Sequence, residues 1–399
     1  MSKLTVKDVS VEGKKVFLRV DLNVPLSTEG EVLDDFKIRA VLPTIHFLLE
    51  RDARLILASH LGRPKGKVVE TLRMAPVARR ISQLLGQEVV VAPGVAGAEV
   101  ERRIEKLPPG GALLLENLRF EPGETQNDPA LAEALSRLAD LFVNDAFGTA
   151  HRAHASNCGI SAYLPAVAGL LMERELLYLA KSRENPTRPM TAILGGKKVA
   201  DKIGVIRYFM EQADHLLLGG AMANTFLRAQ GHPLGNSLFE EDKLGVARDI
   251  LQESVDKKAK IILPVDVVVA EELRSSAPFK VTGVENIPQG WGAVDLGPGT
   301  VSLFREIIAA SKTVIWNGPL GAYEFPPFNK GTEDVAEAVA YSGAQSIIGG
   351  GDIVAALRDL GLAEKFTHLS TGGGAVLKYW EGDVLPGLDV LQEKSGAAR

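Results

Sequence analysis

The stretch "ARLILASHLGRPKGK" at residues 53–67 places a short apolar run directly before a cationic loop. The nearly continuous apolar run is typical of a strand buried on both faces of a sheet. The loop holds His60, Arg63 and Lys65, and it is similar to the phosphate loop Gly-x-x-x-x-Gly-Lys-[Ser/Thr]. However, its glycine spacing is one residue short and Val68 stands where the hydroxyl residue belongs. The stretch therefore predicts a parallel strand followed by a loop with three possible interpretations: a defective nucleotide loop, a plain surface turn, or an anion site of another kind.

Apolar runs of the same kind recur along the chain, with helical spacing between them. In the first half they lie at 14–22, 53–59, 88–93, 112–118 and 141–147. In the second half they lie at 190–196, 215–220, 260–269, 313–319, 346–351 and 367–374. Apolar strands that alternate with helices indicate parallel sheets covered on both faces. The predicted fold class is therefore α/β, with two doubly wound, Rossmann-like parallel-sheet domains.

The length of 399 residues exceeds what one ordinary core accommodates, which again predicts two domains. Residues 169–185 have the apolar spacing of a helix, and "NPTRP" at 185–189 then breaks it. We therefore expect four parts along the chain. They are an N-terminal domain (1–170), an interdomain helix and linker (171–188), a C-terminal domain (189–375) and a tail (376–399).

Composition limits the classes of partner. A net charge of −5 gives no reason to expect nucleic-acid or membrane binding over the whole surface. The lone Cys158 excludes an intramolecular disulfide and fits a reducing compartment. The start "MSKLTVKDVS" has no apolar signal core, and no apolar run is long enough to span a membrane. We therefore expect a cytoplasmic protein.

Strand ends of the first half carry cationic and polar side chains. These residues are Arg19, Asp21, Asn23, His60, Arg63, Lys65, Arg119, Asp145, His151, Arg152 and His154, and the predicted helix start at 34–40 adds Lys37 and Arg39. For any one of them, a solvated or ion-paired loop residue is the better explanation. Because the carboxyl ends of parallel strands meet at one edge, four strand ends that share the feature indicate a site. Arginine suits carboxylate and phosphate, so a small anion is expected there.

Strand ends of the second half carry glycine instead, at 195–196, 219–220, 318, 349–351 and 372–374. One glycine pair indicates only a tight turn, but five such turns with Lys198 and Lys202 nearby favour a nucleotide held by backbone N–H groups. Asp352 follows the triple glycine and is a candidate Mg²⁺ ligand. The chain has no Gly-x-Gly-x-x-Gly motif, which argues against a nicotinamide site, and no His or Cys cluster completes a zinc site.

Eight motifs together resemble phosphoglycerate kinase, in the order of that family and over nearly the whole chain. They are "RVDLNVP" (19–25), "SHLGRPKG" (59–66), "LLENLRFEPGE" (114–124), "NDAFGTAHRAHAS" (144–156), "VADKIGVI" (199–206), "WNGPLGAYEFPPFNKGT" (316–332), "GGGD" (349–352) and "STGGGA" (370–375).

The resemblance implies two domains that face each other across a cleft, with a tail that returns to the first. It also implies reversible, Mg²⁺-dependent phosphoryl transfer between ATP and the carboxylate of 3-phosphoglycerate, in a monomer without nucleic-acid or membrane partners. The implied substrate-binding residues are Arg19, Asp21, Asn23, Lys37, His60, Arg63, Arg119 and Arg152. The implied nucleotide-binding residues are Lys198, Lys202, Gly219, Ala293, Asn317, Glu324, Gly349, Gly350, Gly351, Asp352 and Ile353. The implied catalytic residues are Lys37, Lys198 and Gly373, and the implied metal ligand is Asp352.

Several positions depart from the family pattern. Lys37 stands where the family has an arginine, and it keeps the charge but not the planar fork. Further departures near the expected nucleotide site are Lys197, Asn224, Ala293, Ile353, Val376 and Lys378. These changes leave two alternatives open: a slow or non-catalytic relative, and a kinase for another small carboxylate or phosphate. A nicotinamide dehydrogenase is a more distant alternative.

Overall fold

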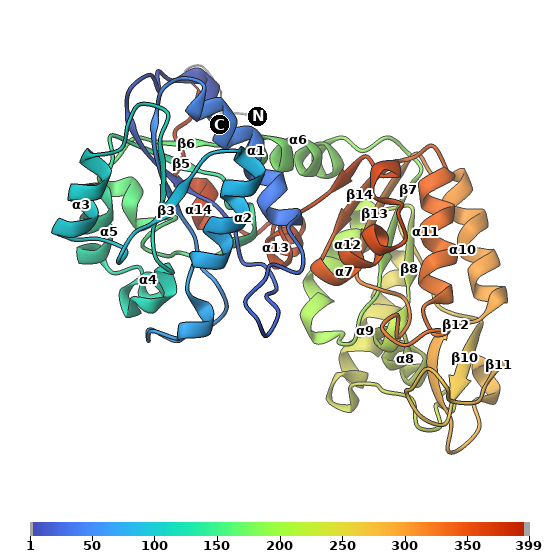
Figure 1. Cartoon of the computed structure of the whole chain (residues 1–399). Helices are drawn as coiled ribbons and strands as arrows, with labels where there is room; N and C mark the ends of the chain where they lie inside the picture. Colours follow the sequence, from blue (N-terminus) through green and yellow to red (C-terminus); the bar gives the residue numbers. More distant parts are fainter. Residues whose placement is uncertain (1–2, 395–399) are drawn as a thin grey trace. The chain divides into compact units, whose positions relative to one another are not determined.

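The computed structural model describes residues 3–394 and divides the chain into two compact units (Figure 1). Among the described residues, the first unit holds 3–177 and 384–394, and the second holds 178–383. The division falls inside the helix α6 (Leu170–Glu184). Residues 376–383, which the sequence groups with the tail, belong to the second unit.

The first unit is a parallel sheet with helices around it. Its strands are β1 (Lys15–Arg19), β2 (Arg54–Ala58), β3 (Val89–Val91), β4 (Ala112–Leu114), β5 (Leu141–Asn144) and β6 (Ala166–Ala168), in the order β3-β4-β2-β1-β5-β6. Its helices are α1 (Phe36–Leu49), α2 (Ala75–Leu85), α3 (Ala98–Glu105), α4 (Pro122–Gln126), α5 (Pro129–Ser136) and α14 (Pro386–Asp389). The strand order reverses between β1 and β5, and ligands of doubly wound sheets bind beyond the strand ends at such a point.

The second unit has a parallel sheet of the same kind and a small antiparallel one. The parallel strands are β7 (Met190–Leu194), β8 (His215–Leu218), β9 (Lys260–Ile262), β13 (Thr313–Asn317), β14 (Gln345–Gly349) and β15 (His368–Leu369), in the order β15-β14-β13-β7-β8-β9. The helices are α7 (Ile203–Gln212), α8 (Gly220–Ala229), α9 (Leu244–Glu253), α10 (Pro298–Ala310), α11 (Lys330–Tyr341), α12 (Gly351–Asp359) and α13 (Gly374–Glu381). Here the order reverses between β7 and β13.

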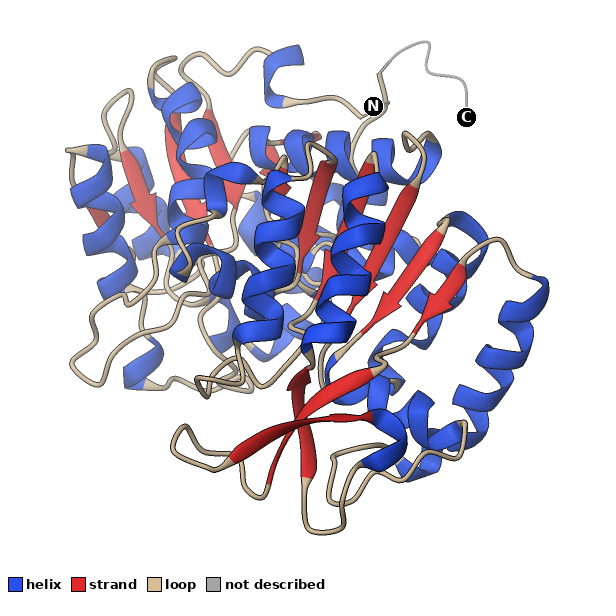
Figure 2. Ribbon diagram, turned by 90° about the vertical axis from the view of Figure 1, so that its right-hand side faces the viewer, coloured by secondary structure: helices blue, strands red, loops and turns tan. Residues whose placement is uncertain are grey.

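The small sheet is the feature that the sequence did not predict. It has the order β11-β10-β12, with β10 at Asp266–Ala270, β11 at Phe279–Gly283 and β12 at Gly292–Leu296 (Figure 2). The apolar run at 260–269 was expected as one strand, but it divides at Pro264 into β9 and β10, which lie in different sheets. The division has a simple reason, because proline has no N–H to donate to a central strand.

Apolar side chains explain why the strands are central. β5, β7 and β13 are buried along their whole length, which agrees with the prediction of sheets covered on both faces. Local signals set the helix ends. Asp128 begins α5 by accepting bonds from two backbone N–H groups, and Gly86 ends α2 in the left-handed conformation. Within residues 3–394, no helix combines the length and apolar character that a membrane crossing requires.

Candidate functional site

The carboxyl ends of β1 and β2 begin the candidate site of the first unit. Asp21 and Asn23 follow β1, and His60 and Arg63 follow β2. The Asn23 side-chain oxygen accepts a bond from the Gly62 N–H at 2.8 Å, which joins the two loops. Arg119 lies in the 3₁₀ turn after β4, and its Nη1 donates to the carbonyl of the same Gly62 at 2.8 Å. One short loop therefore connects polar residues from three strand ends.

Arg19 was expected to bind the anion, but its side chain is 0% exposed. It donates to the Ser156 hydroxyl at 2.8 Å and to the carbonyl of Val20, and its Nη2 lies 3.9 Å from a Glu124 carboxylate oxygen. Burial lowers the pKa of Arg19, and Glu124 opposes this shift. Arg19 therefore supports the site from beneath in this structure and does not line it.

His60 is uncharged at neutral pH in this setting. Burial lowers its pKa well below the ordinary value, and the cationic Arg19 and Arg119 lower it further. Its Nδ1 lies 3.4 Å from Nη2 of Arg19, and an arginine can only donate. Nδ1 therefore accepts, which leaves the proton on Nε2 as a donor for a ligand.

Lys37 and Asp21 form an ion pair at the edge of the same site. The Lys37 ammonium, in the first turn of α1, lies 2.9 Å from Asp21 Oδ2. Burial would raise the pKa of Asp21, but the charge and hydrogen bond of Lys37, together with His60 and the Asn23 N–H, outweigh burial and lower the pKa to about 2. Asp21 therefore stays ionised and fixes the position of Lys37.

Arg119 shows that positive charge at the site is not fully compensated. Its Nε is buried without a hydrogen-bond partner among the described residues. Burial and the nearby charges of Arg152 and Arg19 lower its pKa to about 10. Arg63 and Arg152 are exposed beside it. We call the cations Lys37, Arg63, Arg119 and Arg152, together with the neutral hydrogen-bond donor His60, the cationic cluster. Its composition suits a small acid with more than one anionic group.

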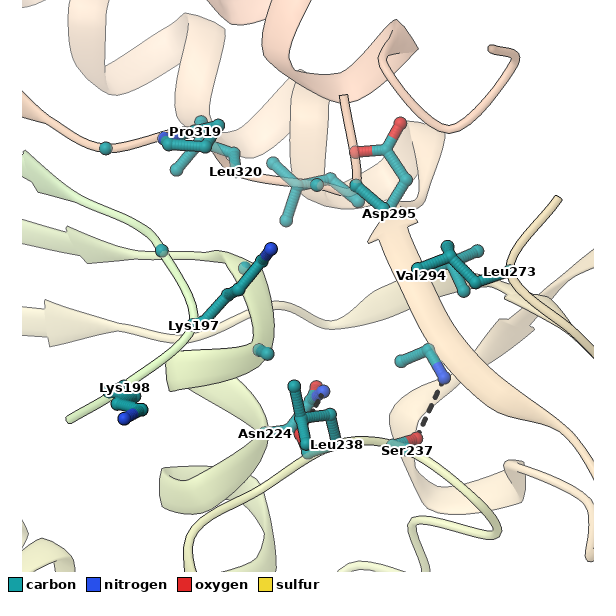
Figure 3. Close-up of a pocket in the computed structure, with 18 of the residues that line it drawn as sticks. Lys197, Lys198, Asn224, Ser237, Leu238, Leu273, Val294, Asp295, Pro319 and Leu320 are labelled. Carbon is teal, nitrogen blue, oxygen red and sulfur yellow. Dashed lines mark hydrogen bonds between the residues drawn. The ribbon is translucent and has the colours of Figure 1, made fainter. Parts of the chain in front are cut away.

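The second unit holds a cavity of about 610 Å³ at the β7–β13 end of its sheet (Figure 3). The predicted residues that line it are Lys198, Lys202, Ala293, Asn317, Glu324, Gly350, Gly351 and Asp352. Gly219, Gly349 and Ile353 do not line it. Ile353 is 0% exposed and packs in the core, so its side chain does not face the cavity.

Lys202 is the most constrained cation of this cavity. Its ammonium donates to the carbonyl and the side-chain oxygen of Asn317, at 3.0 and 2.6 Å, and to the carbonyl of Gly195. Burial lowers its pKa to about 7. Gly318 has φ +87°, and a Cβ there would lie 2.7 Å from the Lys202 nitrogen, so this turn requires glycine.

Backbone N–H groups complete the polar side of the cavity. Gly350 lines the cavity and precedes α12, whereas the predicted catalytic residue Gly373, which precedes α13, does not line it; both have positive φ. Helix N-termini favour phosphate. Asp352 lies in the first turn of α12, and no group of three metal-ligating side chains occurs in residues 3–394. A single carboxylate fits Mg²⁺ that is also held by nucleotide phosphates, since Mg²⁺ needs few protein ligands.

Comparison with known proteins decides the family. The sequence model described as phosphoglycerate kinase matches residues 6–383. The chain belongs to the phosphoglycerate kinase family. It is similar to the structure of phosphoglycerate kinase from Coxiella burnetii, with 40% identity, a TM-score of 0.86, and coverage of 97% of this chain and 98% of that one. It is also similar to phosphoglycerate kinase from Pyrococcus horikoshii OT3, with 33% identity, a TM-score of 0.87, and coverage of 98% of both chains.

Family membership fixes the reaction. The enzyme transfers a phosphoryl group between ATP and 3-phosphoglycerate, a step of glycolysis. The resemblance and the two-domain α/β fold are therefore confirmed. The alternative of a relative without transfer activity is not favoured.

Three of the departing residues have structural partners. Asn224 donates to the carbonyl of Leu238 at 3.0 Å, and thus holds a loop that lines the cavity. Lys378 forms ion pairs with Glu381 and Asp383, at 2.6 and 3.0 Å. Val376 is fully buried. Val376 therefore packs in the core and Lys378 forms surface ion pairs, whereas Asn224 itself lines the cavity.

Two carboxylates that support the sites were missed by sequence reasoning. Glu124 is 0% exposed and accepts from the Ser156 N–H and hydroxyl, at 3.0 and 2.7 Å. Glu240 accepts from the backbone N–H groups of Val199 and Ala200, and so holds the segment that carries Lys198 and Lys202. Glu124 ends a motif quoted above, which was the one available signal.

Proposed function

We propose that the cationic cluster binds 3-phosphoglycerate and that the cavity of the second unit binds ATP or ADP. The observation that carries the first part is the buried, unpartnered Nε of Arg119 among like charges. An anion supplies the missing acceptor and offsets the charge. Arg63 and Arg152 contribute exposed guanidinium forks, and Asp21 and Asn23 hold the surrounding loops.

The proposed reaction needs no general base. The acceptor carboxylate is ionised at neutral pH, so its oxygen attacks the terminal phosphorus of ATP directly. The new oxygen–phosphorus bond forms as the bond to ADP breaks, and no proton is transferred. Catalysis then consists of positioning and charge stabilisation. We assign these tasks to Lys37, Lys198 and the backbone N–H groups that follow Gly373. Because the two sites lie in different units, transfer requires that the two ligands be brought together.

Asp352 is the proposed protein ligand of Mg²⁺. When bound with the nucleotide, Mg²⁺ neutralises part of the phosphate charge. Asp352 itself contributes an exposed carboxylate at the start of α12. The proposed working state is a monomer in the cytoplasm, as the family resemblance implies, and the lone Cys158 fits a reducing compartment.

Steady-state turnover in both directions tests these assignments. Arg63→Ala should raise KM for 3-phosphoglycerate, whereas Arg137→Ala, an exposed arginine paired with Glu133, should leave it unchanged. Lys37→Arg should retain turnover, and Lys37→Met should lose at least about a hundredfold. If wild type turned over no faster than Arg63→Ala, the assignment of the cationic cluster as the 3-phosphoglycerate site would be contradicted.

A further inference from the structure

Lys197 lies at the mouth of the nucleotide cavity, next to the predicted Lys198. Its ammonium is 4.0 Å from Glu324 Oε1, and the two side chains are 77% and 46% exposed. Figure 3 shows the Lys197 side chain extending into the cavity, whereas that of Lys198 extends away from it. Both partners of this ion pair line the cavity.

The cavity lining is richer in carboxylates than in ammonium groups. Its carboxyl groups belong to Asp201, Glu271, Glu272, Asp295, Glu324 and Asp352, and its ammonium groups belong to Lys197, Lys198 and Lys202. Burial raises the pKa of Asp295 to about 7, so this group is partly neutral at physiological pH. Lys202 already donates to three protein oxygens. A polyanion that enters the cavity therefore has few free cations to meet.

We propose that Lys197 and Glu324 form an exchangeable latch at the mouth of the cavity, and that Lys197 is a further nucleotide-binding residue of this enzyme. When a nucleoside diphosphate or triphosphate enters, the Lys197 ammonium leaves Glu324 and pairs with the phosphate chain. The Glu324 carboxylate, already expected among the nucleotide-binding residues, then lies beside the bound ligand without its ammonium partner. This inference rests on the proposed role of the cavity in nucleotide binding.

The energetics favour such an exchange. An exposed ion pair stabilises the free protein little, so it breaks at small cost. A phosphate chain carries more negative charge than one carboxylate and offers several acceptor oxygens, so it is the stronger partner for an ammonium. The exchange also leaves the Glu324 acceptor beside the ligand. The latch therefore favours phosphorylated nucleosides over the bare nucleoside.

Calorimetric titration with ADP, adenosine and tripolyphosphate separates this role from a structural one. The variants are Lys197→Met, which removes the ammonium group and keeps an unbranched side chain, and Glu324→Gln, which keeps the length of the side chain. Lys257→Met is the matched control, because Lys257 forms an exposed ion pair with Glu211 at 2.6 Å outside the cavity. Thermal melts of each variant establish that it is folded, and Lys197→Arg tests rescue by charge.

Lys197→Met should weaken ADP binding about tenfold, which is about 1.4 kcal/mol, and should leave adenosine binding within about twofold. KM for the nucleotide should rise, while KM for 3-phosphoglycerate and kcat stay near wild type. Glu324→Gln should strengthen tripolyphosphate binding and weaken adenosine binding. If wild type binds ADP, two results for Lys197→Met would overturn the latch and leave the proposed nucleotide site intact. One is an equal loss of affinity for ADP and adenosine, and the other is no loss of affinity for either. Failure of wild type to bind ADP would overturn the proposed nucleotide site as well.

Discussion

Lys202 predicts that nucleotide binding takes up a proton. In the free protein its ammonium is buried, bonded only to neutral oxygens, and has a pKa of about 7. A phosphate brought next to it favours the charged form and returns the pKa towards the ordinary value of 10.5. Linkage then gives an uptake of about 0.5 proton at pH 7 and about 0.9 proton at pH 8. Between pH 8 and 10, ADP affinity should fall by roughly eight- to ninefold for each pH unit.

Calorimetry of ADP binding in buffers of different ionisation enthalpy measures this uptake. Lys202→Met removes the titrating group, while the phosphates of ADP contribute equally to both proteins. Asp295→Asn controls for the other group of the cavity whose pKa is about 7. Equal proton uptake by wild type and Lys202→Met at pH 8 would refute the reasoning, because the uptake would then come from elsewhere.

Lys202 also links pH to stability, with a definite sign. Its pKa is lower in the folded protein than in the unfolded chain, so the unfolded chain binds more protons between pH 7 and 10.5. The cost of the buried ammonium is fully present below pH 7 and disappears as the pH rises to 10.5. Lys202→Met should therefore gain stability relative to wild type at pH 7 and lose that advantage at high pH.

Three further predictions concern buried polar groups and one glycine. Glu124→Gln leaves the buried Arg19 charge uncompensated, so it should destabilise the first unit by about 3 kcal/mol. Denaturant melts should show a lower midpoint, and an unchanged midpoint would contradict the buried ion pair. Gly318→Ala places a Cβ close to the Lys202 nitrogen at a backbone position with positive φ. The substitution should therefore lower the free energy of unfolding by about 1–3 kcal/mol and weaken ADP binding. An unaltered ADP titration would argue against the close approach. Burial raises the pKa of Asp145 to about 7 from the ordinary value of 3.8. The folded protein therefore loses stability as the pH rises through this range, because the buried carboxyl group must ionise. The stability that Asp145→Asn gains over wild type should be larger at pH 8 than at pH 5. A pH-independent difference between the two Asp145 melts would contradict that assignment.

The parallel sheets could be predicted because burial on both faces leaves a continuous apolar run. The sequence indicated β2, β7 and β13 in this way, and the structure confirms them. The small antiparallel sheet could not be predicted, because β11 is mostly exposed and reads as an ordinary polar segment. The division of the run at 260–269 was signalled by Pro264, but an apolar pattern cannot tell which sheet each half will join.

The position of site residues was harder to predict than their presence. Arg19 and Arg119 both follow apolar strands, yet Arg19 is buried beneath the site and Arg119 reaches its edge. The position of a residue after a strand predicts the end of the sheet at which it lies, but it does not predict the direction in which its side chain points. Ile353 illustrates the same limit, because one helical position separates it from Asp352 and yet its side chain faces the core. Lys197 was noted only as a departure, and its pairing with Glu324 needed the folded loops.

Separate binding of the two ligands tests the central claim most directly. The measurement is calorimetric titration of wild type, Arg119→Met and Lys202→Met with 3-phosphoglycerate and, separately, with ADP. The proposed division of sites predicts that Arg119→Met loses 3-phosphoglycerate binding and retains ADP binding, and that Lys202→Met does the reverse. Loss of both ligands in either folded variant, or retention of 3-phosphoglycerate by Arg119→Met, would contradict it.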